Sequence, residues 1–315
     1  MLNRFKIIYI ELFIILYIIK MLYKIDKPNV LGESPIWNHF NDTYYWVDID
    51  DHKIKKFDDF YKEYDVIYNG IKVKPTCLAL IDGNKLFTVV EDGFGIYDFR
   101  QKNAFNYVSI PDFVDDNFRK NLRFNDGKCD RNGNLYIGTM DLNKPRKPIG
   151  NIYKLTPDLK TIKVFENISV TNGISFSTNN YNMFFSDTPT KKIYMCKPPN
   201  SLTKINYRMS LEDDKSNRAP DGSTIDIENN YYSCLYGGYG VDVFSTVNNN
   251  INYKYTIKTN YKNNTCCCFG GVNMDKLMIT SADNPDDPND NGYTTIRDSN
   301  TIGLKEKPIN LNFTH

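Results

Sequence analysis

Histidine is scarce in this sequence, which has only His39, His52 and His315 in 315 residues. No nucleophile-elbow motif accompanies them, so the sequence disfavours a hydrolase of the Ser-His-Asp type. Because imidazole ligands are also nearly absent, a metal site in this chain would depend mainly on oxygen-bearing side chains.

Net charge is nearly absent as well. The chain has 39 Lys and Arg against 38 Asp and Glu, a formal charge of +1 at pH 7. No stripe of basic residues interleaved with aromatic residues appears. The sequence therefore gives no electrostatic support for a nucleic-acid partner or for a strong membrane partner.

Paired cysteine motifs are missing. The seven cysteines are odd in number, three of them are consecutive at positions 266–268, and none form a CxxC pair. This pattern argues against a zinc knuckle and against a disulfide framework. We expect the cysteines to be small, buried, apolar side chains of a protein in a reducing compartment.

A sustained helical period of apolar residues is absent between Pro28 and Thr301. Short β-rich runs stand there instead, separated by turn residues: Tyr44–Val47, Leu86–Val89, Leu135–Gly138, Met183–Ser186, Tyr231–Cys234 and Leu277–Thr280. Matching residues of successive runs are 42, 49, 48, 48 and 46 positions apart. This period is typical of a propeller blade, and six units follow from it.

The repeat predicts an all-β, six-bladed β-propeller in one domain over residues 26–315. A closed ring leaves few sheet edges and needs no partner for stability, so we expect a monomer. A protein-binding scaffold propeller would show repeated Trp-Asp pairs. This chain has two Trp residues, and neither is followed by Asp.

Residues 1–25 form an apolar N-terminal extension. Arg4 and Lys6 precede the apolar stretch Ile7–Ile19, as in a signal peptide, but Glu11 interrupts the stretch and no small-residue cleavage site follows. It is too short to be read with assurance as a membrane span. Either it is a signal or anchor, or part of it is the strand that closes the ring. We expect a cytoplasmic protein, and a secreted one if the segment is a signal peptide.

Four distant segments place a small polar or acidic side chain beside Gly or Pro: Leu31–Pro35, Arg123–Gly127, Thr171–Gly173 and Pro220–Gly222. Their spacing is close to whole multiples of the repeat, so we expect loops that converge on the ring axis. Oxygen ligands that converge from separate repeats make a cation site. The pattern indicates a central metal site, and oxygen donors favour Ca²⁺, Mg²⁺ or Mn²⁺, with Zn²⁺ suited to a site completed by water.

A set of ordered motifs over roughly residues 30–285 resembles the signature blocks of the gluconolactonase, regucalcin and luciferin-regenerating enzyme family. The motifs are Gly32–Trp37, Tyr45–Ile49, Arg123–Lys128, Gly138–Met140, Asn172–Gly173, Pro220–Gly222 and Cys268–Gly271. The resemblance implies a six-bladed propeller with one divalent cation in its channel. It also implies hydrolysis of a small-molecule sugar lactone.

Carried over residue by residue, the resemblance assigns roles to six side chains. Glu33, Asn172 and Asp221 match the metal ligands, and Asp221 also matches the general base. Arg123 and Asn125 match residues that face the substrate. Asp126, next to them, is the third expected substrate contact.

Taken singly, these residues have ordinary structural interpretations. Asp221 and Asn172 precede glycine, as turn-forming residues often do, and a lone Glu33 or Arg123 would most often be solvated. Only the ordered set favours a site. A non-enzymatic calcium-binding regulatory protein on the same propeller would need the same ligands, so the sequence leaves that alternative open. The strands after residue 284 have no clear pattern.

Overall fold

The structure is a computed structural model that describes residues 22–60, 62–69, 73–101, 105–203, 207–210, 217–246 and 250–312. The apolar stretch expected as a signal or anchor, and His315, therefore lie outside the described residues. Within them, no helix is long and apolar enough to cross a membrane.

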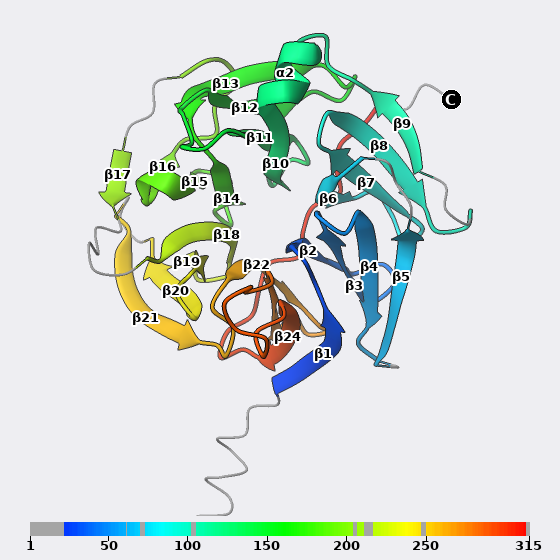
Figure 1. The fold of residues 1–315 in the computed structure, drawn as a ribbon, viewed down its shortest axis with the longest axis vertical. Coiled ribbons are helices and arrows are strands. Elements are labelled where there is room, and N and C mark those ends of the chain that lie inside the picture. The colour runs from blue at the N-terminus through cyan, green and yellow to red at the C-terminus, as the bar shows by residue number, and fades with distance from the viewer. Residues whose placement is uncertain are drawn as a thin grey trace, which may run out of the picture.

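Six four-stranded antiparallel sheets are arranged as a ring (Figure 1). The innermost strands, in chain order, are β2 (Gly32–Asn38), β6 (Pro75–Leu80), β10 (Leu122–Cys129), β14 (Thr171–Phe176), β18 (Ala219–Ile225) and β22 (Asn264–Gly270). The runs that revealed the repeat are the second strands, β3 (Thr43–Asp48), β7 (Lys85–Val90), β11 (Leu135–Asp141), β15 (Met183–Asp187), β19 (Asn230–Tyr236) and β23 (Lys276–Ser281). The predicted six-bladed propeller is confirmed.

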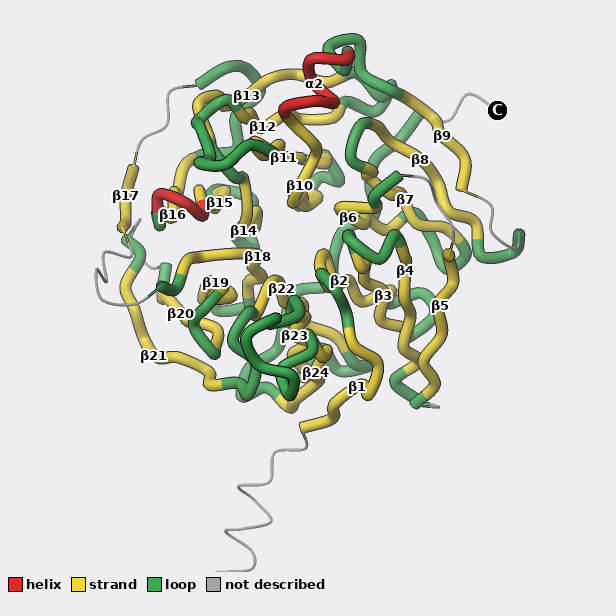
Figure 2. The backbone as a smooth tube through the Cα atoms, viewed as in Figure 1, coloured by secondary structure: helices red, strands yellow, loops and turns green. Residues whose placement is uncertain are grey.

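The third strands are β4 (Lys53–Asp58), β8 (Gly93–Asp98), β12 (Gly150–Leu155), β16 (Lys192–Cys196), β20 (Gly240–Ser245) and β24 (Tyr293–Asp298). The outermost strands are β5 (Glu63–Asn69), β9 (Phe105–Ser109), β13 (Thr161–Ile168), β17 (Tyr207–Ser210), β21 (Asn252–Lys258) and β1 (Leu22–Pro28). Strands dominate the described chain, as Figure 2 shows. Its helical elements are the short α2 (Asp116–Asn121) and the 3₁₀ turn η1 (Thr188–Thr190).

The ring is closed by β1, the first described strand. It pairs antiparallel with β24, with Ile25 opposite Thr294, and so completes blade six from the other end of the chain. Residue 25, the expected end of the extension, falls inside this strand. The polar run that sequence patterns did not place is the loop between β23 and β24.

The core lies between neighbouring blades. Every residue of β2 and β3 is buried, whereas β21 is mostly exposed, because inner strands are covered on both faces and outer strands on one. Large aromatic side chains such as Trp37, Trp46 and Tyr44 fill these interfaces. Burying each aromatic side chain stabilises the fold by roughly 4 to 6 kcal/mol before entropy is counted. All seven cysteines are free and six are buried, as expected.

Each innermost strand has a bulge near its start. The pairing register shifts between Glu33 and Ile36 on β2, and at equivalent places on β6, β10, β14, β18 and β22. Ser34 and Gly173 adopt left-handed backbone conformations there, with φ of 47° and 62°. The prediction that the signature segments are loops is therefore wrong. They are bulged strands, because Gly and short polar residues supply the conformations that a bulge needs just as they supply those of a turn.

The bulges also join neighbouring blades. The Ser34 hydroxyl accepts a hydrogen bond from the Leu78 amide at 2.9 Å, and the Ser175 and Ser223 hydroxyls are 2.8 Å apart. These contacts fix the inner strands relative to one another.

The C-terminal segment, residues 299–312, crosses the ring after β24 (Figure 1). Its backbone bonds to blades five, two and three: Ile227 N donates to Ile302 O at 3.0 Å, Ile309 N to Leu80 O at 2.8 Å and Asn310 N to Gly133 O at 2.8 Å. Glu306, in the middle of this segment, reaches Lys128 of β10.

Candidate functional site

The bulges bring the six predicted residues together at the start of the innermost strands. They come from four blades and are between 4% and 9% exposed: Glu33, Arg123, Asn125, Asp126, Asn172 and Asp221. Asn125 Nδ2 lies 2.8 Å from Asn172 Oδ1 across the boundary of blades three and four. The charges of Glu33 and Asp126 act on Asp221 from blades one and three. Residues far apart in the chain therefore share one small volume.

Burial and neighbouring negative charge disfavour the ionised forms of two carboxyl groups, Glu33 and Asp221. Burial, and then the charge of Asp126, raises the pKa of Glu33 to about 8. Burial, and then the charge of Glu33, raises the pKa of Asp221 well above its usual range. Glu33 accepts one hydrogen bond, from its neighbour Ser34 N at 3.0 Å. Asp221 Oδ1 is buried and has no hydrogen-bond partner in the described part of the chain.

Arg123 supplies the positive charge nearest to this pair. Burial lowers its pKa to about 10, so it remains a cation at neutral pH. Its Nη1 donates to Phe124 O at 2.9 Å and to Asn125 Oδ1 at 2.7 Å. When both are ionised, Glu33 and Asp221 carry two negative charges against the single positive charge of Arg123, so a bound cation would stabilise the ionised pair.

Glu33, Asp221 and the amide oxygen of Asn172 are the donors that could hold such a cation. No three His, Cys, Asp or Glu side chains in the described ranges are placed to share an ion, so this set depends on the Asn172 amide. The orphaned oxygen of Asp221 and the hard-donor chemistry of all three side chains fit a divalent metal.

Asp126 differs from Glu33 and Asp221 because its carboxylate is bonded to the backbone of a neighbouring blade. Its Oδ2 accepts a hydrogen bond from Ile174 N at 3.1 Å, which ties blade three to blade four. This bond gives Asp126 a structural role that the motif did not reveal. Contact between Asp126 and a substrate stays a prediction.

Sequence reasoning missed the side chains that support the site. Asp48 Oδ1 accepts from Leu31 N at 2.9 Å, and Asp187 Oδ1 accepts from Val170 N at 3.0 Å, so each holds the chain just before an innermost strand. Thr188, next in the chain, contacts both Asn172 and Pro220. The recurrence of Asp at the end of the second strands was a signal that could have found the first two.

A different arrangement of charge lies further along β10. Lys128 Nζ is 3.2 Å from Glu306 Oε1, with side chains 11% and 9% exposed. Burial alone would lower the pKa of Lys128, but the Glu306 carboxylate, together with other nearby groups that include Asp126, outweighs burial and raises it. A cavity of about 10 Å³, enough for one water, lies among four innermost strands and is lined by both Asp126 and Glu306.

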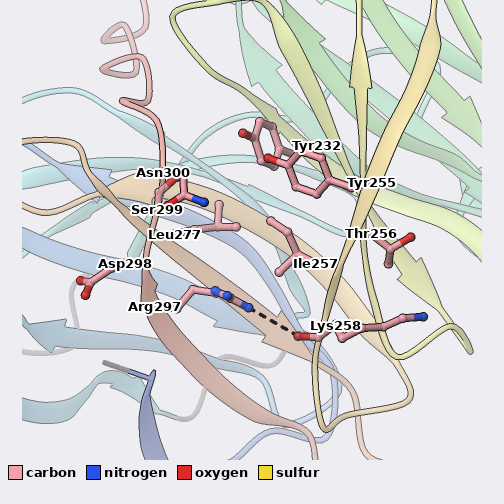
Figure 3. Close-up of a pocket in the computed structure, with 10 residues that line it drawn as sticks. All are labelled: Tyr232, Tyr255, Thr256, Ile257, Lys258, Leu277, Arg297, Asp298, Ser299 and Asn300. Carbon is pink, nitrogen blue, oxygen red and sulfur yellow. Dashed lines mark hydrogen bonds between the residues drawn. The ribbon is translucent and has the colours of Figure 1, made fainter. Parts of the chain in front are cut away.

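A roomier cavity of about 320 Å³ lies between blades five and six (Figure 3). It contains none of the six predicted residues, and two of its polar side chains have partners within the protein. Arg297 Nη1 donates to Lys258 O at 3.4 Å, and the Tyr232 hydroxyl to Asp226 Oδ2 at 3.1 Å. The axial group, with its unpartnered carboxylate oxygen, is therefore the candidate site.

Comparison with known proteins places these features in context. The family model described as SMP-30/Gluconolactonase/LRE-like region matches residues 31–283. The chain is 32% identical to YvrE of Bacillus subtilis (strain 168), whose name describes a sugar lactone lactonase, over 82% of this chain and 85% of that protein. It is 27% identical to human regucalcin, over 82% and 85%.

Solved structures show the same fold. A luciferin-regenerating enzyme superposes with a TM-score of 0.81 at 24% identity, covering 92% of this chain and 99% of that one. Regucalcin from Agrobacterium tumefaciens, described as a calcium-binding protein, gives 0.79 at 24% identity, covering 90% and 94%.

Proposed function

Because the family model matches most of its length, the chain belongs to the SMP-30/gluconolactonase/LRE-like family, and we propose that it is a metal-dependent hydrolase that opens sugar lactones. The observation that carries the proposal is the buried carboxyl pair Glu33 and Asp221, in which Asp221 Oδ1 has no hydrogen-bond partner among the described residues. A relative of similar length whose name describes a lactonase supports the substrate class.

In this proposal, Glu33, Asn172 and Asp221 hold one divalent cation: Ca²⁺, Mg²⁺ or Mn²⁺, or Zn²⁺ with water completing the site. When bound, the cation supplies a Lewis acid for the lactone carbonyl and for the negative charge that develops on its oxygen.

The other steps belong to the chain's own side chains. Asp221 Oδ1, which has no partner among the described groups, accepts the proton of the attacking water as general base. Arg123 keeps its charge and has further N–H donors beyond the two hydrogen bonds of its Nη1, so it binds the sugar hydroxyls. Asn125 is held between Arg123 and Asn172, and it orients the ring relative to Asp221.

A direct test measures opening of δ-gluconolactone by EDTA-treated protein supplied with Mn²⁺, Zn²⁺, Ca²⁺ or no metal. We expect cation-dependent turnover that Asp221→Asn and Glu33→Gln abolish while the thermal unfolding midpoint shows that both variants stay folded. Asp242→Asn is a matched control, because Asp242 is a buried aspartate of the same blade as Asp221 but lies on β20. Turnover that survives both axial substitutions would remove the mechanism.

A calcium-binding regulatory protein without catalysis is the second candidate. The similarity to human regucalcin, and to a solved regucalcin described as calcium-binding, favours it. The same assay separates the two, because this candidate predicts calcium binding that Glu33→Gln weakens, with no lactone turnover under any metal.

A further inference from the structure

A chain of four side-chain hydrogen bonds crosses blades three, four and five. Arg123 Nη1 donates to Asn125 Oδ1 at 2.7 Å, and Asn125 Nδ2 donates to Asn172 Oδ1 at 2.8 Å. Asn172 Nδ2 then donates to Thr188 Oγ1 at 2.8 Å. The Thr188 hydroxyl donates to the backbone carbonyl of Pro220, also at 2.8 Å.

The direction of every bond in this chain is determined by its two ends. A guanidinium can only donate, and a carbonyl oxygen can only accept. The single hydroxyl proton of Thr188 is used on Pro220 O, so Thr188 can only accept from Asn172. If the Asn172 amide were rotated by 180°, its oxygen would face a hydroxyl oxygen with no proton to offer, and its NH₂ would face the NH₂ of Asn125.

Asn125 is fixed in the same sense by a second bond. Its Nδ2 also donates to Thr171 O at 2.8 Å, so both amide protons are used. The Asn172 oxygen therefore lies on the side of Asn125 and keeps one lone pair beyond the bond it accepts. This oxygen is the atom that the proposed function requires as a ligand.

We propose that Thr188 is a positioning residue that fixes the Asn172 amide with its oxygen available to a cation. The inference rests on the proposed function, since it concerns the same site. Thr188 is not one of the residues proposed to bind substrate, and it acts through two neighbours. It holds the side chain of Asn172, and it holds the backbone immediately before Asp221, so it couples two of the three proposed ligands.

The local sequence makes Thr188 a rigid support. Asp187 anchors the preceding strand to Ser169 N and Val170 N at 3.1 and 3.0 Å. The 3₁₀ turn η1 follows at once, with Pro189 in its first turn and Lys191 in a left-handed conformation that ends it. Thr188 N donates to Val170 O at 3.2 Å. The hydroxyl is thus held by a turn with few conformational alternatives.

The test compares three variants of the full chain after EDTA treatment. Thr188→Val has nearly the same shape and removes both hydrogen bonds, whereas Thr188→Ser keeps the hydroxyl. Thr190→Val is the matched control, because Thr190 lies in the same turn and its Oγ1 donates to Asp187 O at 3.0 Å, a bond that is not part of the four-bond series. Mn²⁺ and Ca²⁺ affinities are measured by calorimetry, alongside the unfolding midpoint in EDTA and kcat and KM for δ-gluconolactone.

We expect Thr188→Val to weaken cation binding 10- to 100-fold, because loss of a hydrogen-bond partner that orients a metal ligand typically lowers metal affinity by this factor. Thr188→Ser should stay within about 3-fold of the wild type, and Thr190→Val should bind as the wild type does. At saturating cation, Thr188→Val should recover most of its kcat, which a purely structural role would not produce.

Wild-type cation affinity in Thr188→Val would overturn this inference and leave the proposed function intact. So would a loss in a folded Thr188→Ser as large as that in Thr188→Val. Absence of cation binding by the wild-type protein would overturn both proposals together.

Discussion

Two clusters of buried charged residues near the propeller axis differ in whether their charges are paired. At the start of the innermost strands, the charge of Glu33 acts on Asp221, and Asp221 Oδ1 has no hydrogen-bond partner among the described residues. About 10 Å further along β10, Lys128 meets Glu306 of the C-terminal segment in an ion pair. Buried charge is costly unless it is paired. Buried charge is paired at the Lys128–Glu306 end, whereas Asp221 Oδ1 at the other end has no hydrogen-bond partner among the described residues. This difference supports our proposal that the Glu33–Asp221 end is functional and the Lys128–Glu306 end is structural.

The largest expected effect comes from a substitution in the Glu33–Asp221 pair. Asp221→Asn should lower kcat/KM for δ-gluconolactone by about 10³- to 10⁴-fold, because a general base and a ligand are lost together. The free energy of unfolding without metal should not fall, since an uncharged amide replaces a carboxyl group whose ionised form is disfavoured by burial and by the charge of Glu33. Steady-state kinetics and thermal unfolding in EDTA check the two halves. A loss below tenfold would contradict the role of Asp221.

Substitution in the Lys128–Glu306 ion pair should instead lower stability and leave catalysis nearly unchanged. Glu306→Gln leaves Lys128 buried and unpaired, which should destabilise the fold by about 3 to 5 kcal/mol. The change in kcat/KM, measured well below the unfolding temperature, should stay within about 3-fold. Denaturant unfolding measures the stability change.

A double variant, Lys128→Met with Glu306→Leu, provides the control for that loss. It should recover most of the stability, because an apolar pair replaces the ion pair. If Glu306→Gln were as stable as the wild type, the second group would not be structural.

The pH dependence of stability should separate the two ends. The pKa of Glu33 rises from an ordinary 4.5 to about 8 in the folded protein, so between these values the folded state holds a proton that the unfolded state has lost. The free energy of unfolding without metal should therefore fall as pH rises from 5 to 8, by up to about 1.4 kcal/mol per pH unit.

Glu33→Gln should flatten this slope, and Glu306→Gln should not. Cation affinity should rise with pH over the same interval, because binding releases the proton. Thermal unfolding in EDTA across the pH range measures the slope, and a stability that rises over this interval would contradict the buried carboxylate pair.

The smallest expected effect concerns Arg123, whose guanidinium lies near Glu33 and Asp221. Arg123→Lys keeps the charge but loses the planar fork of donors, so KM for δ-gluconolactone should rise about 10-fold with little change in kcat. Arg131→Lys is the matched control, because Arg131 is 3.9 Å from Glu306 at the other end. Equal KM values for the two variants would argue against substrate contact by Arg123.

Much of the fold could be predicted because it repeats. Runs such as Leu135–Gly138 recur at one period, and each proved to be the second strand of a blade. The first strands were misassigned as loops. Thr171–Gly173 has the composition of a turn, and only pairing with β15 shows that it is a bulged strand.

The sequence motifs singled out the residues that lie together in the candidate site, but not the bonds that connect them. Glu33, Asn172 and Asp221 stood out because their motifs are ordered along the chain. Asp126 belongs to the same motif, yet its bond to Ile174 N appears only once blades three and four are adjacent. Thr188 and Glu306 belong to no motif, and their partners are 16 and 178 residues away in sequence. No local pattern could have identified them.

The sequence by itself determined the number of blades, the all-β class and the residues that gather on the axis, because periodicity and motif order are local properties that survive without coordinates. Only the tertiary structure decided which buried charges are paired. Pairing depends on distances between groups from different blades, and closure of the ring sets these distances. It places Glu306 beside Lys128 and leaves Asp221 Oδ1 without a partner among the described residues.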